Sequence, residues 1–378
     1  MAEITRALIA RVGVDLAKNV IQVHAVDRAG RRVVARAIKR DQFLAWCAQL
    51  PPGCLVAMEA CSGAHAWARR LRVLGLDARL IAASFVSPYR MQGKLGKNDM
   101  TDAAAVCEAA SRPTMRFVPI KTAEQQGVMV LHRMREGFKE ERTACINRIR
   151  GVLAEFELVY GKSPKVLRAV LADVIEDASN ELTAVARLSV QQAHEHWRGL
   201  DERMRWCDQQ IGAHVRSSAA AKRAAKVNGI GEIGASALTA GVGDFKQFKS
   251  GRQFGAWLGI VPSQNSSGGK ARLGRITKRG DDYLRTLLIQ GAKSAVMSAG
   301  KRDDPTSRWL VQLVQRVGWQ KACVAMANKN ARILWAVMTR EQGFDAHHVS
   351  AKPQAKAKAS QVVRARPAQT GQAVACAA

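Results

Sequence analysis

The chain has 378 residues, of which 47% are hydrophobic and 24% are charged. This composition excludes a disordered polypeptide and leaves room for roughly two or three domains. Its 59 lysines and arginines outnumber its 31 aspartates and glutamates, giving a formal net charge of +28. Such an excess of cations indicates a polyanionic partner, with nucleic acid as the leading candidate.

Neither membrane attachment nor secretion is expected. The sequence has no apolar run long enough to cross a membrane, and Glu3, Arg6 and Arg11 interrupt its opening residues, unlike a signal peptide. The eight cysteines include no Cys-x-x-Cys pair, as is usual for reduced thiols in the cytoplasm. We therefore expect a cytoplasmic protein that has no membrane partner.

Extended and helical patterns alternate over residues 11–111. Three runs rich in β-branched residues, 11–17, 19–27 and 31–38, predict an antiparallel meander. A helix over 41–50 that Asp41 caps, a strand over 54–60, a helix over 64–75, a strand over 77–83 and a helix over 99–111 follow. This order of elements is that of an α/β ribonuclease-H-like domain.

Four acidic residues lie on elements that come close together in a fold with this order. Asp15 lies in the middle of the first strand, where a charge without a function would be unfavourable, and Glu59 ends the fourth strand. These two strands are neighbours in this fold, and Asp99 and Asp102 share one helix face. Four carboxylates from three elements suit Mg²⁺ or Mn²⁺ and the chemistry of a phosphodiester. Taken by themselves, Asp99 and Asp102 could be cap and first-turn acids, which is the commoner role of such residues near the start of a helix.

The region from residue 112 to residue 222 has an almost wholly helical pattern. Long helices are predicted over 122–160 and 181–215, and two arrangements are open: a helical hairpin that packs on itself, or a coiled-coil arm for dimerisation. The second helix has apolar residues at broadly helical spacing, namely Leu182, Val185, Leu188, Leu200, Met204 and Ile211.

A glycine pattern at Gly229, Gly231 and Gly234 matches the dinucleotide-binding fingerprint. The fingerprint should follow a strand, whereas the preceding residues 219–228 are helical and basic, so a dinucleotide site is not expected. A helix, a glycine turn and a second helix instead predict a helix-hairpin-helix-like element, in which Gly229 and Gly231 let the backbone approach a phosphate. The alternative is a plain tight connection between helices.

The stretch "VPSQNSSGGKARLGRITKRGDD", residues 261–282, combines hydroxyls, glycines and cations. A surface turn is the commoner meaning of such a string; a phosphate cradle and a nucleophile are the alternatives. Ser266 and Ser267 precede Gly268 and Gly269. The cations available to a phosphate are Lys270, Arg272, Arg275, Lys278 and Arg279.

The acid quartet followed by "WLGIVPSQNSSGGKARLGRITKRGDDYLR" resembles the insertion-sequence transposases of the one-ten family, the DEDD transposases understood as bridge-RNA-guided recombinases. The resemblance covers roughly residues 10 to 340. It implies a RuvC-like catalytic domain over 1–158, a helical or coiled-coil segment over 159–222, and a mainly α-helical C-terminal transposase domain with the serine loop over 223–348. The remaining residues, 349–378, are basic and expected to be disordered.

The resemblance also implies a mechanism. Ser267 would be the nucleophile that forms a phosphoserine intermediate, with Ser266 as its alternative, while Asp15, Glu59, Asp99 and Asp102 bind Mg²⁺ or Mn²⁺. An element-encoded non-coding RNA would act as guide RNA by pairing with target and donor DNA. The protein would form a dimer that assembles to a tetramer, with the acids of one subunit working beside the serine of another.

Two other classes of protein compete with this interpretation. A metal-dependent RuvC-like junction resolvase or nuclease would use the same acids with water as nucleophile, leaving the serine loop without a chemical role. A non-enzymatic RNA-binding protein would account for the net charge but not for the carboxylate quartet. Actin-like kinases share the fold and the "GVDLA" type of first strand, but their further phosphate-binding glycine turns are missing here.

Overall fold

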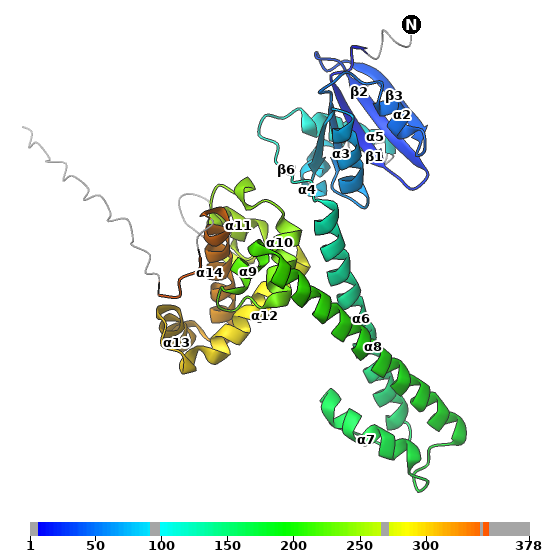
Figure 1. Ribbon diagram of the computed structural model, residues 1–378, viewed down its shortest axis with the longest axis vertical. Coiled ribbons are helices and arrows are strands. Elements are labelled where there is room, and N and C mark those ends of the chain that lie inside the picture. Colours follow the sequence, from blue (N-terminus) through cyan, green and yellow to red (C-terminus); the bar gives the residue numbers. More distant parts are fainter. Residues whose placement is uncertain (1–6, 91–98, 266–271, 341–342, 348–378) are drawn as a thin grey trace, which may run out of the picture. The chain divides into compact units, whose positions relative to one another are not determined.

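The computed structural model describes residues 7–90, 99–265, 272–340 and 343–347 (Figure 1). The chain divides into the units Met1–Ala346 and His347–Ala378, and all the helices and strands below lie in the first. None of the helices formed by the described residues is both long enough and apolar enough to span a membrane.

The N-terminal part contains a six-stranded sheet with the order β3-β2-β1-β4-β5-β6. The first three strands form the predicted antiparallel meander, and β4 and β5 add to β1 in parallel. A short sixth strand pairs antiparallel with β5 at the edge. The strands are β1 Arg11–Leu16, β2 Val20–Val26, β3 Arg32–Lys39, β4 Leu55–Glu59, β5 Asp77–Ile81 and β6 Phe117–Val118.

Helices cover both faces of this sheet because its central strands are apolar on both sides. On β4, Val56 and Met58 belong to the core that includes Trp67 of α3 (Ala64–Val73), whereas Ala57 belongs to the core that includes Val106 of α5 (Asp99–Ala110). Alternate residues of a strand point to opposite faces. Helices α3 and α5 therefore lie on opposite faces, as the ribonuclease-H-like order of elements requires.

Helix α2 (Phe43–Cys47) is shorter than the predicted helix over 41–50. The expected cap was wrong as well: Gln42 holds the N-cap position, and no side chain caps the helix. The burial of Phe43, Trp46 and Cys47 fixes the helix on the sheet. After Cys47 the chain tightens into turns, in which the Leu50 N–H donates to the Cys47 carbonyl.

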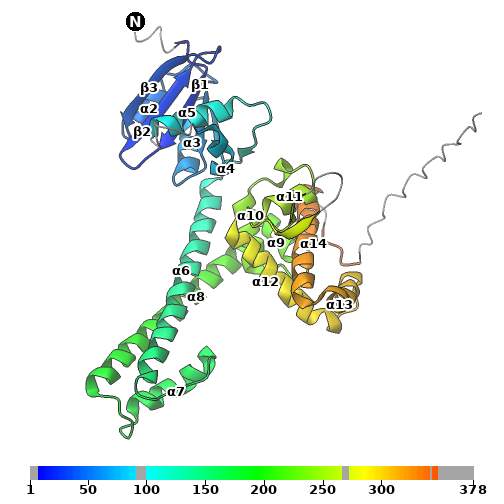
Figure 2. The ribbon, with the colours of Figure 1, turned by 180° about the vertical axis from the view of Figure 1, so that it is seen from behind.

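Three helices form the middle of the chain: α6 (Ala123–Ala154), α7 (Pro164–Glu176) and α8 (Ala184–Ser217). Helices α6 and α8 pack side by side (Figure 1; Figure 2). This is the hairpin alternative within one chain, and Leu200 lies in its apolar core, whereas Val185 and Leu188 are exposed. Thr122 and Gln125 form a capping box that starts α6.

The C-terminal part is mainly helical, as predicted. Its core brings together Leu238, Phe254, Leu288 and Leu334 from four helices. The two-stranded sheet formed by β7 and β8 was not expected. The elements are α9 Ala219–Ala225, α10 Glu232–Val242, α11 Gly251–Trp257, β7 Pro262–Gln264, β8 Leu273–Ile276, α12 Asp282–Ser298, α13 Pro305–Val317 and α14 Trp319–Arg340.

The close approach of α5 to β1 depends on Gly13. A Cβ atom at this position would lie 2.2 Å from the Ala103 carbonyl oxygen. We therefore expect Gly13→Ala to lower the free energy of unfolding by about 2 to 3 kcal/mol, because the backbone of α5 must move. Gly127→Ala, at an open position in α6, should instead raise it by up to about 1 kcal/mol. Urea unfolding checks both, and equal stability of the two variants would contradict the close packing.

Candidate active site

Asp15 and Glu59 lie at the carboxyl ends of two neighbouring parallel strands. Val14 of β1 is opposite Met58 of β4, so the next residues of the two strands are Asp15 and Glu59. The sequence pattern placed Asp15 in the middle of its strand, which was wrong: β1 ends at Leu16. Strand β4, the parallel neighbour of β1, ends at the same edge of the sheet. The carboxylates of Asp15 and Glu59 therefore share this edge.

Helix α5 brings the other two acids to this edge. Asp99 and Asp102 both lie in its first turn, and the helix packs against β1 at Gly13. Asp102 is buried and Asp99 is exposed. Burial raises the pKa of Asp15, and the negative charges of the other three carboxylates raise it further. The other three acids are therefore close enough to Asp15 for their charges to act on it.

Arg90 lies among these acids, and the sequence analysis did not identify it. It follows the short 3₁₀ helix Ser87–Tyr89. Its Nη2 donates to Glu59 Oε1 at 2.6 Å, and its Nε donates to Asp102 Oδ1 at 2.7 Å. One guanidinium thus bridges the carboxylates of a strand and a helix, and its charge also acts to lower the pKa of Asp15. Only its position shortly before Asp99 could have marked it in the sequence.

The donor chemistry of the four acids fits a hard divalent cation, since carboxylate oxygens are the ligands that Mg²⁺ and Mn²⁺ prefer. Within residues 7–90, 99–265, 272–340 and 343–347, however, no three acidic, histidine or cysteine side chains form a group arranged to hold a metal ion. In the same structure the Arg90 guanidinium forms ion pairs with Glu59 and Asp102. The quartet thus has the residue types of a metal site, and two of its four carboxylates are paired with an arginine.

A cationic hollow of about 670 Å³ lies on the N-terminal domain. Its residues come from the β1–β2 turn, the end of β3 and helix α3, too far apart in the sequence to be recognised together. The guanidinium groups of Arg40 and Arg70 lie 5.3 Å and 5.5 Å from the centre of the Trp67 ring. The lining comprises four cations, one acid and an apolar floor: Lys18, Asn19, Val20, Lys39, Arg40, Asp41, Leu44, Trp67 and Arg70.

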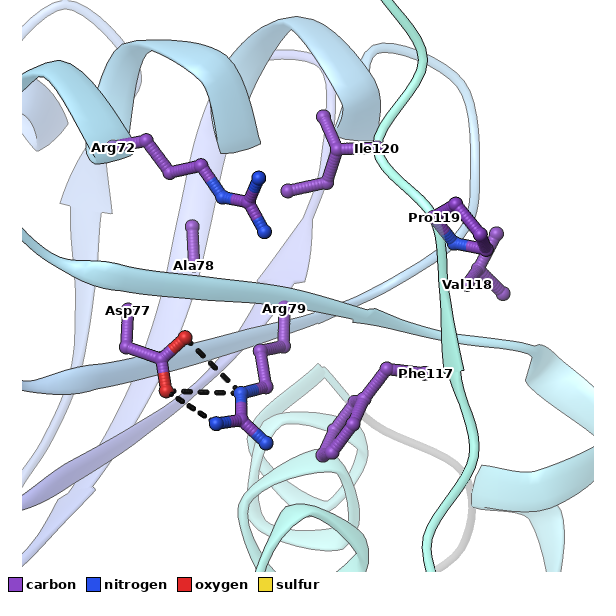
Figure 3. A pocket seen from close by; sticks show the side chains of 8 residues that line it. All are labelled: Arg72, Asp77, Ala78, Arg79, Phe117, Val118, Pro119 and Ile120. Carbon is purple, nitrogen blue, oxygen red and sulfur yellow. Dashed lines mark hydrogen bonds and ion pairs between the residues drawn. The ribbon is translucent and has the colours of Figure 1, made fainter. Parts of the chain in front are cut away.

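A second hollow, of about 350 Å³, lies between α3, β5 and β6 (Figure 3). Of its two cations, Arg72 and Arg79, the second is already paired with Asp77, the Nε to Oδ2 distance being 2.9 Å. The Arg79 guanidinium also lies 4.7 Å from the centre of the Phe117 ring. One of the two charges is therefore compensated within the protein, whereas four cations and one acid line the first hollow, so the first hollow is the better candidate for a polyanion.

The strands β7 and β8 flank the serine loop. Five of the residues singled out in the sequence, Ser266, Ser267, Gly268, Gly269 and Lys270, lie outside the described residues. The flanking cations Arg272, Arg275, Lys278 and Arg279 are all exposed.

The base of this loop is firmly held. The Thr277 N–H donates to the Val261 carbonyl at 2.9 Å, and the Lys278 N–H donates to the Gly259 carbonyl at 3.0 Å. Arg285, which is only 5% exposed, donates to the Gly280 carbonyl and forms an ion pair with Asp282. The loop therefore starts and ends on backbone that is fixed to α11 and α12.

The two glycines assigned to phosphate contact differ in their surroundings. Gly229 has a φ of +82°, and a Cβ there would lie 2.8 Å from the Gly291 carbonyl oxygen of α12. The neighbouring Asn228 carbonyl accepts a hydrogen bond from Asn330 of α14. Packing of the turn on two helices therefore explains the glycine at 229. Gly231, at the N-cap of α10, has open space where a side chain would stand, and its contact with phosphate stays a prediction.

A buried polar junction links four helices of the same unit. His132 of α6 is fully buried; its Nδ1 lies 2.9 Å from the Tyr283 hydroxyl of α12, and its Nε2 lies 2.9 Å from the Ser236 hydroxyl of α10. His214 of α8 lies 3.0 Å from the same serine. Burial lowers the pKa of His132 to about 4, so its imidazole is neutral at pH 7. The junction ties the helical hairpin to the start of α12, which follows the serine loop.

Acids gathered at one edge of a ribonuclease-H-like sheet, in a chain with a large excess of cations, are typical of an enzyme that processes nucleic acid. Comparison with known proteins agrees. A family model described as "Transposase" matches residues 12–157, which contain the whole quartet. A second, described as "Transposase IS116/IS110/IS902 family", matches residues 221–307, which contain the serine loop.

Relatives align along most of the chain. A "Probable family 20 transposase" of Pseudomonas aeruginosa is 49% identical over 334 residues, covering 88% of this chain and 98% of the relative. The "Transposase for insertion sequence element IS1111A" of Coxiella burnetii is 39% identical over 333 residues, 88% of this chain and 90% of the relative. The chain belongs to the IS110 family of insertion-sequence transposases. It is accordingly an enzyme that cleaves and rejoins DNA, and its DEDD domain indicates dependence on a divalent metal.

The polar junction predicts a pH effect on stability. The unfolded chain protonates histidine near pH 6.5, whereas folded His132 stays neutral down to about pH 4. Stability is therefore fully present above pH 6.5 and falls as the pH drops towards 4, by about 3 kcal/mol from this residue. Urea unfolding across this range should show a smaller decrease for His132→Gln than for the wild type. The exposed His196 of α8 is the control, and an unchanged pH dependence in His132→Gln would contradict the assignment.

Proposed function

We propose that this transposase cuts and rejoins DNA through a phosphoserine intermediate formed on Ser267, with a divalent metal held by Asp15, Glu59, Asp99 and Asp102. The observation that carries the proposal is the gathering of four carboxylates at one sheet edge, where, in addition to burial, the other three raise the pKa of Asp15. Taken alone, Asp99 and Asp102 would be ordinary first-turn acids. Their proximity to Asp15 and Glu59, on two other elements, favours a shared catalytic role.

The covalent step balances without an external energy source. The Ser267 Oγ loses its proton and forms a bond to phosphorus, the bond from phosphorus to the 3′ oxygen of the DNA breaks, and the departing 3′ oxygen takes up a proton and leaves as a hydroxyl. In the rejoining step a 3′ hydroxyl attacks the phosphoserine and releases the serine, so the number of phosphoester bonds is conserved. Mg²⁺ or Mn²⁺, when bound, supplies electrophilic stabilisation of the phosphate and the departing oxygen.

Cationic residues beside the serine loop would have a role of their own in this mechanism. A serine hydroxyl is barely ionised at neutral pH and needs positive charge nearby to attack a phosphate. Arg275, Lys278 and Arg279 are exposed beside the loop, and they would neutralise charge that develops on the phosphate oxygens. The fixed base of the loop, with Arg285 buried beneath it, would limit the motion of the serine once DNA is bound.

Selection of the DNA sequence is assigned to an element-encoded non-coding RNA rather than to the protein. The cations that could contact nucleic acid are spread over the hollow of the N-terminal domain and the edges of the serine loop. Such contacts position a backbone and carry no sequence information. A guide RNA that pairs with target and donor DNA would supply what these contacts lack, and Gly231 would add a further phosphate contact.

We also propose that the active form is a dimer that assembles to a tetramer. The acids lie in the proposed RuvC-like domain, residues 1–158, and the serine lies in the C-terminal transposase domain, residues 223–348. The helical segment 159–222 separates the two along the chain. A helical spacer of this kind suits an arrangement in which the acids of one subunit serve the serine of another, and the basic residues 349–378 would be a solvated tail.

The covalent intermediate can be tested directly. Protein, guide RNA and end-labelled DNA are incubated with Mg²⁺ and separated on a denaturing gel. We expect a protease-sensitive protein–DNA adduct for the wild type and for Ser266→Ala, and none for Ser267→Ala. Glu59→Gln should bind DNA as the wild type does and form no adduct.

An adduct that survives Ser267→Ala and disappears in Ser266→Ala would move the nucleophile to the neighbouring serine. Cleavage by all serine variants, without any adduct, would overturn the phosphoserine mechanism in favour of a metal-dependent nuclease or junction resolvase that uses water.

The cationic hollow gives a second prediction. Lys39→Gln combined with Arg70→Gln should weaken binding of duplex DNA of any sequence alike. Because two cations no longer neutralise phosphates, the slope of log affinity against log salt should fall by roughly 2. Lys165→Gln combined with Arg205→Gln, at exposed positions of α7 and α8, is the matched control. Fluorescence anisotropy measures the DNA affinity of both double variants at several salt concentrations. Equal slopes for the two variants would exclude the hollow as a phosphate site.

A further inference from the structure

We propose that Arg90 is a positioning residue that closes the acid quartet to metal in the free protein and moves to a phosphate when nucleic acid binds. Metal binding and nucleic-acid binding would then be coupled through one side chain. The inference rests on the proposed role of the quartet and goes beyond it, because it assigns a function to a residue outside the four acids.

The contacts of Arg90 are those of a clamp across the site. Its guanidinium reaches Glu59 at 2.6 Å and Asp102 at 2.7 Å, so it joins the end of β4 to the first turn of α5. Hydrogen bonds between two charged groups at such distances are stronger than neutral ones. One oxygen of Glu59 and one oxygen of Asp102 are therefore already engaged by a cation.

Arg90 and a divalent ion compete for the same oxygens. A Mg²⁺ ion requires carboxylate oxygens at roughly 2.0 to 2.1 Å in a near-octahedral arrangement, and the repulsion between the ion and the guanidinium adds to the steric conflict. Displacing the guanidinium breaks two charged hydrogen bonds. In the free protein, the loss of these hydrogen bonds makes metal binding less favourable. The affinity of the free protein for a metal ion is therefore lower than the four carboxylates alone would give.

The side chain of Arg90 is free enough to leave. It is 28% exposed, and its two partners are 18% and 12% exposed, so the ion pairs lie at the border of the solvent rather than in a sealed core. The backbone beside it is held in place, because the Arg90 N–H donates to the Ser87 carbonyl and the Arg112 guanidinium lies 5.5 Å from the centre of the Tyr89 ring. The Arg90 side chain is thus partly exposed to solvent while its backbone is held by a hydrogen bond, as is expected of a residue that exchanges one binding partner for another.

A phosphate is the partner that fits this exchange. The planar guanidinium binds carboxylate and phosphate through the same forked geometry. A DNA or RNA strand brought to the quartet would offer phosphate oxygens to Arg90 and leave the carboxylates to the metal. By linkage, nucleic acid would raise the affinity for metal and metal would raise the affinity for nucleic acid by the same factor. The free protein would thereby avoid metal-dependent hydrolysis of nucleic acid.

Mn²⁺ binding to the full-length protein, measured by calorimetry or by electron paramagnetic resonance of the free ion, tests the inference without an activity assay. In the absence of nucleic acid, Arg90→Gln should bind Mn²⁺ roughly tenfold more tightly than the wild type, within the usual range of coupling between sites. Arg79→Gln, which removes an arginine of β5 that pairs with Asp77, is the control and should bind Mn²⁺ as the wild type does.

Addition of a duplex oligonucleotide completes the test. It should tighten Mn²⁺ binding to the wild type and have a clearly smaller effect on Arg90→Gln. Equal or weaker Mn²⁺ binding by Arg90→Gln without nucleic acid would overturn the inference and reduce Arg90 to a structural ion pair. If Arg90→Gln does not fold, Arg90→Lys decides: lysine keeps the charge but lacks the fork, so Mn²⁺ affinity should exceed that of the wild type, and an unchanged affinity would refute the proposal.

Failure of the metal site itself gives a different result. Glu59→Gln should lose Mn²⁺ affinity in every background, because it removes a carboxylate. Retention of wild-type Mn²⁺ affinity by Glu59→Gln would overturn the assignment of the quartet as a metal site, whatever the behaviour of Arg90→Gln.

Discussion

Four carboxylates held close together repel one another, and this repulsion is the constraint on which the rest of the site depends. Burial raises the pKa of Asp15 and the repulsion raises it further; the same repulsion favours binding of a cation at this edge of the sheet. In this structure Arg90 supplies the charge by pairing with Glu59 and Asp102. In the mechanism that we propose, a divalent metal supplies it when DNA is bound. A large excess of cations elsewhere serves a different purpose, which is attraction of the nucleic-acid backbone.

The fold creates this constraint through a few close contacts. The parallel pairing of β1 and β4 brings two acids to one sheet edge, and the absence of a side chain at Gly13 lets α5 bring the other two. In the C-terminal part the serine loop is held at its base, where Arg285 is buried against Gly280. The polar junction around His132 then joins α12, which follows the loop, to the helical hairpin. Packing and hydrogen bonds therefore hold both the elements that carry the acids and the described residues that flank the serine loop.

The sequence predicted the features that depend on local pattern and order of elements. The meander, the alternation that follows it and the end of β4 at Glu59 were predicted because strands and helices have distinct periods. The helix predicted over 41–50 exists, but its bounds and its cap at Asp41 were wrong, because the helix starts after Gln42 without a side-chain cap and the chain turns after Cys47. Arg90, the cationic hollow and the junction around His132 could not be predicted, since they join residues far apart in the chain through side-chain geometry. The need for glycine at 229 likewise arises from packing on α12, which no local pattern reveals.

In the mechanism that we propose, the quartet exchanges an arginine for a metal when nucleic acid binds. This exchange can be seen in a crystal structure of the full-length protein with guide RNA, DNA and Mn²⁺, in which anomalous scattering locates the metal. We expect a manganese peak at coordination distance from Asp15 and Glu59, with the Arg90 guanidinium on a phosphate oxygen. A complex in which Arg90 still bridges Glu59 and Asp102, with manganese bound elsewhere or absent from the quartet, would contradict it.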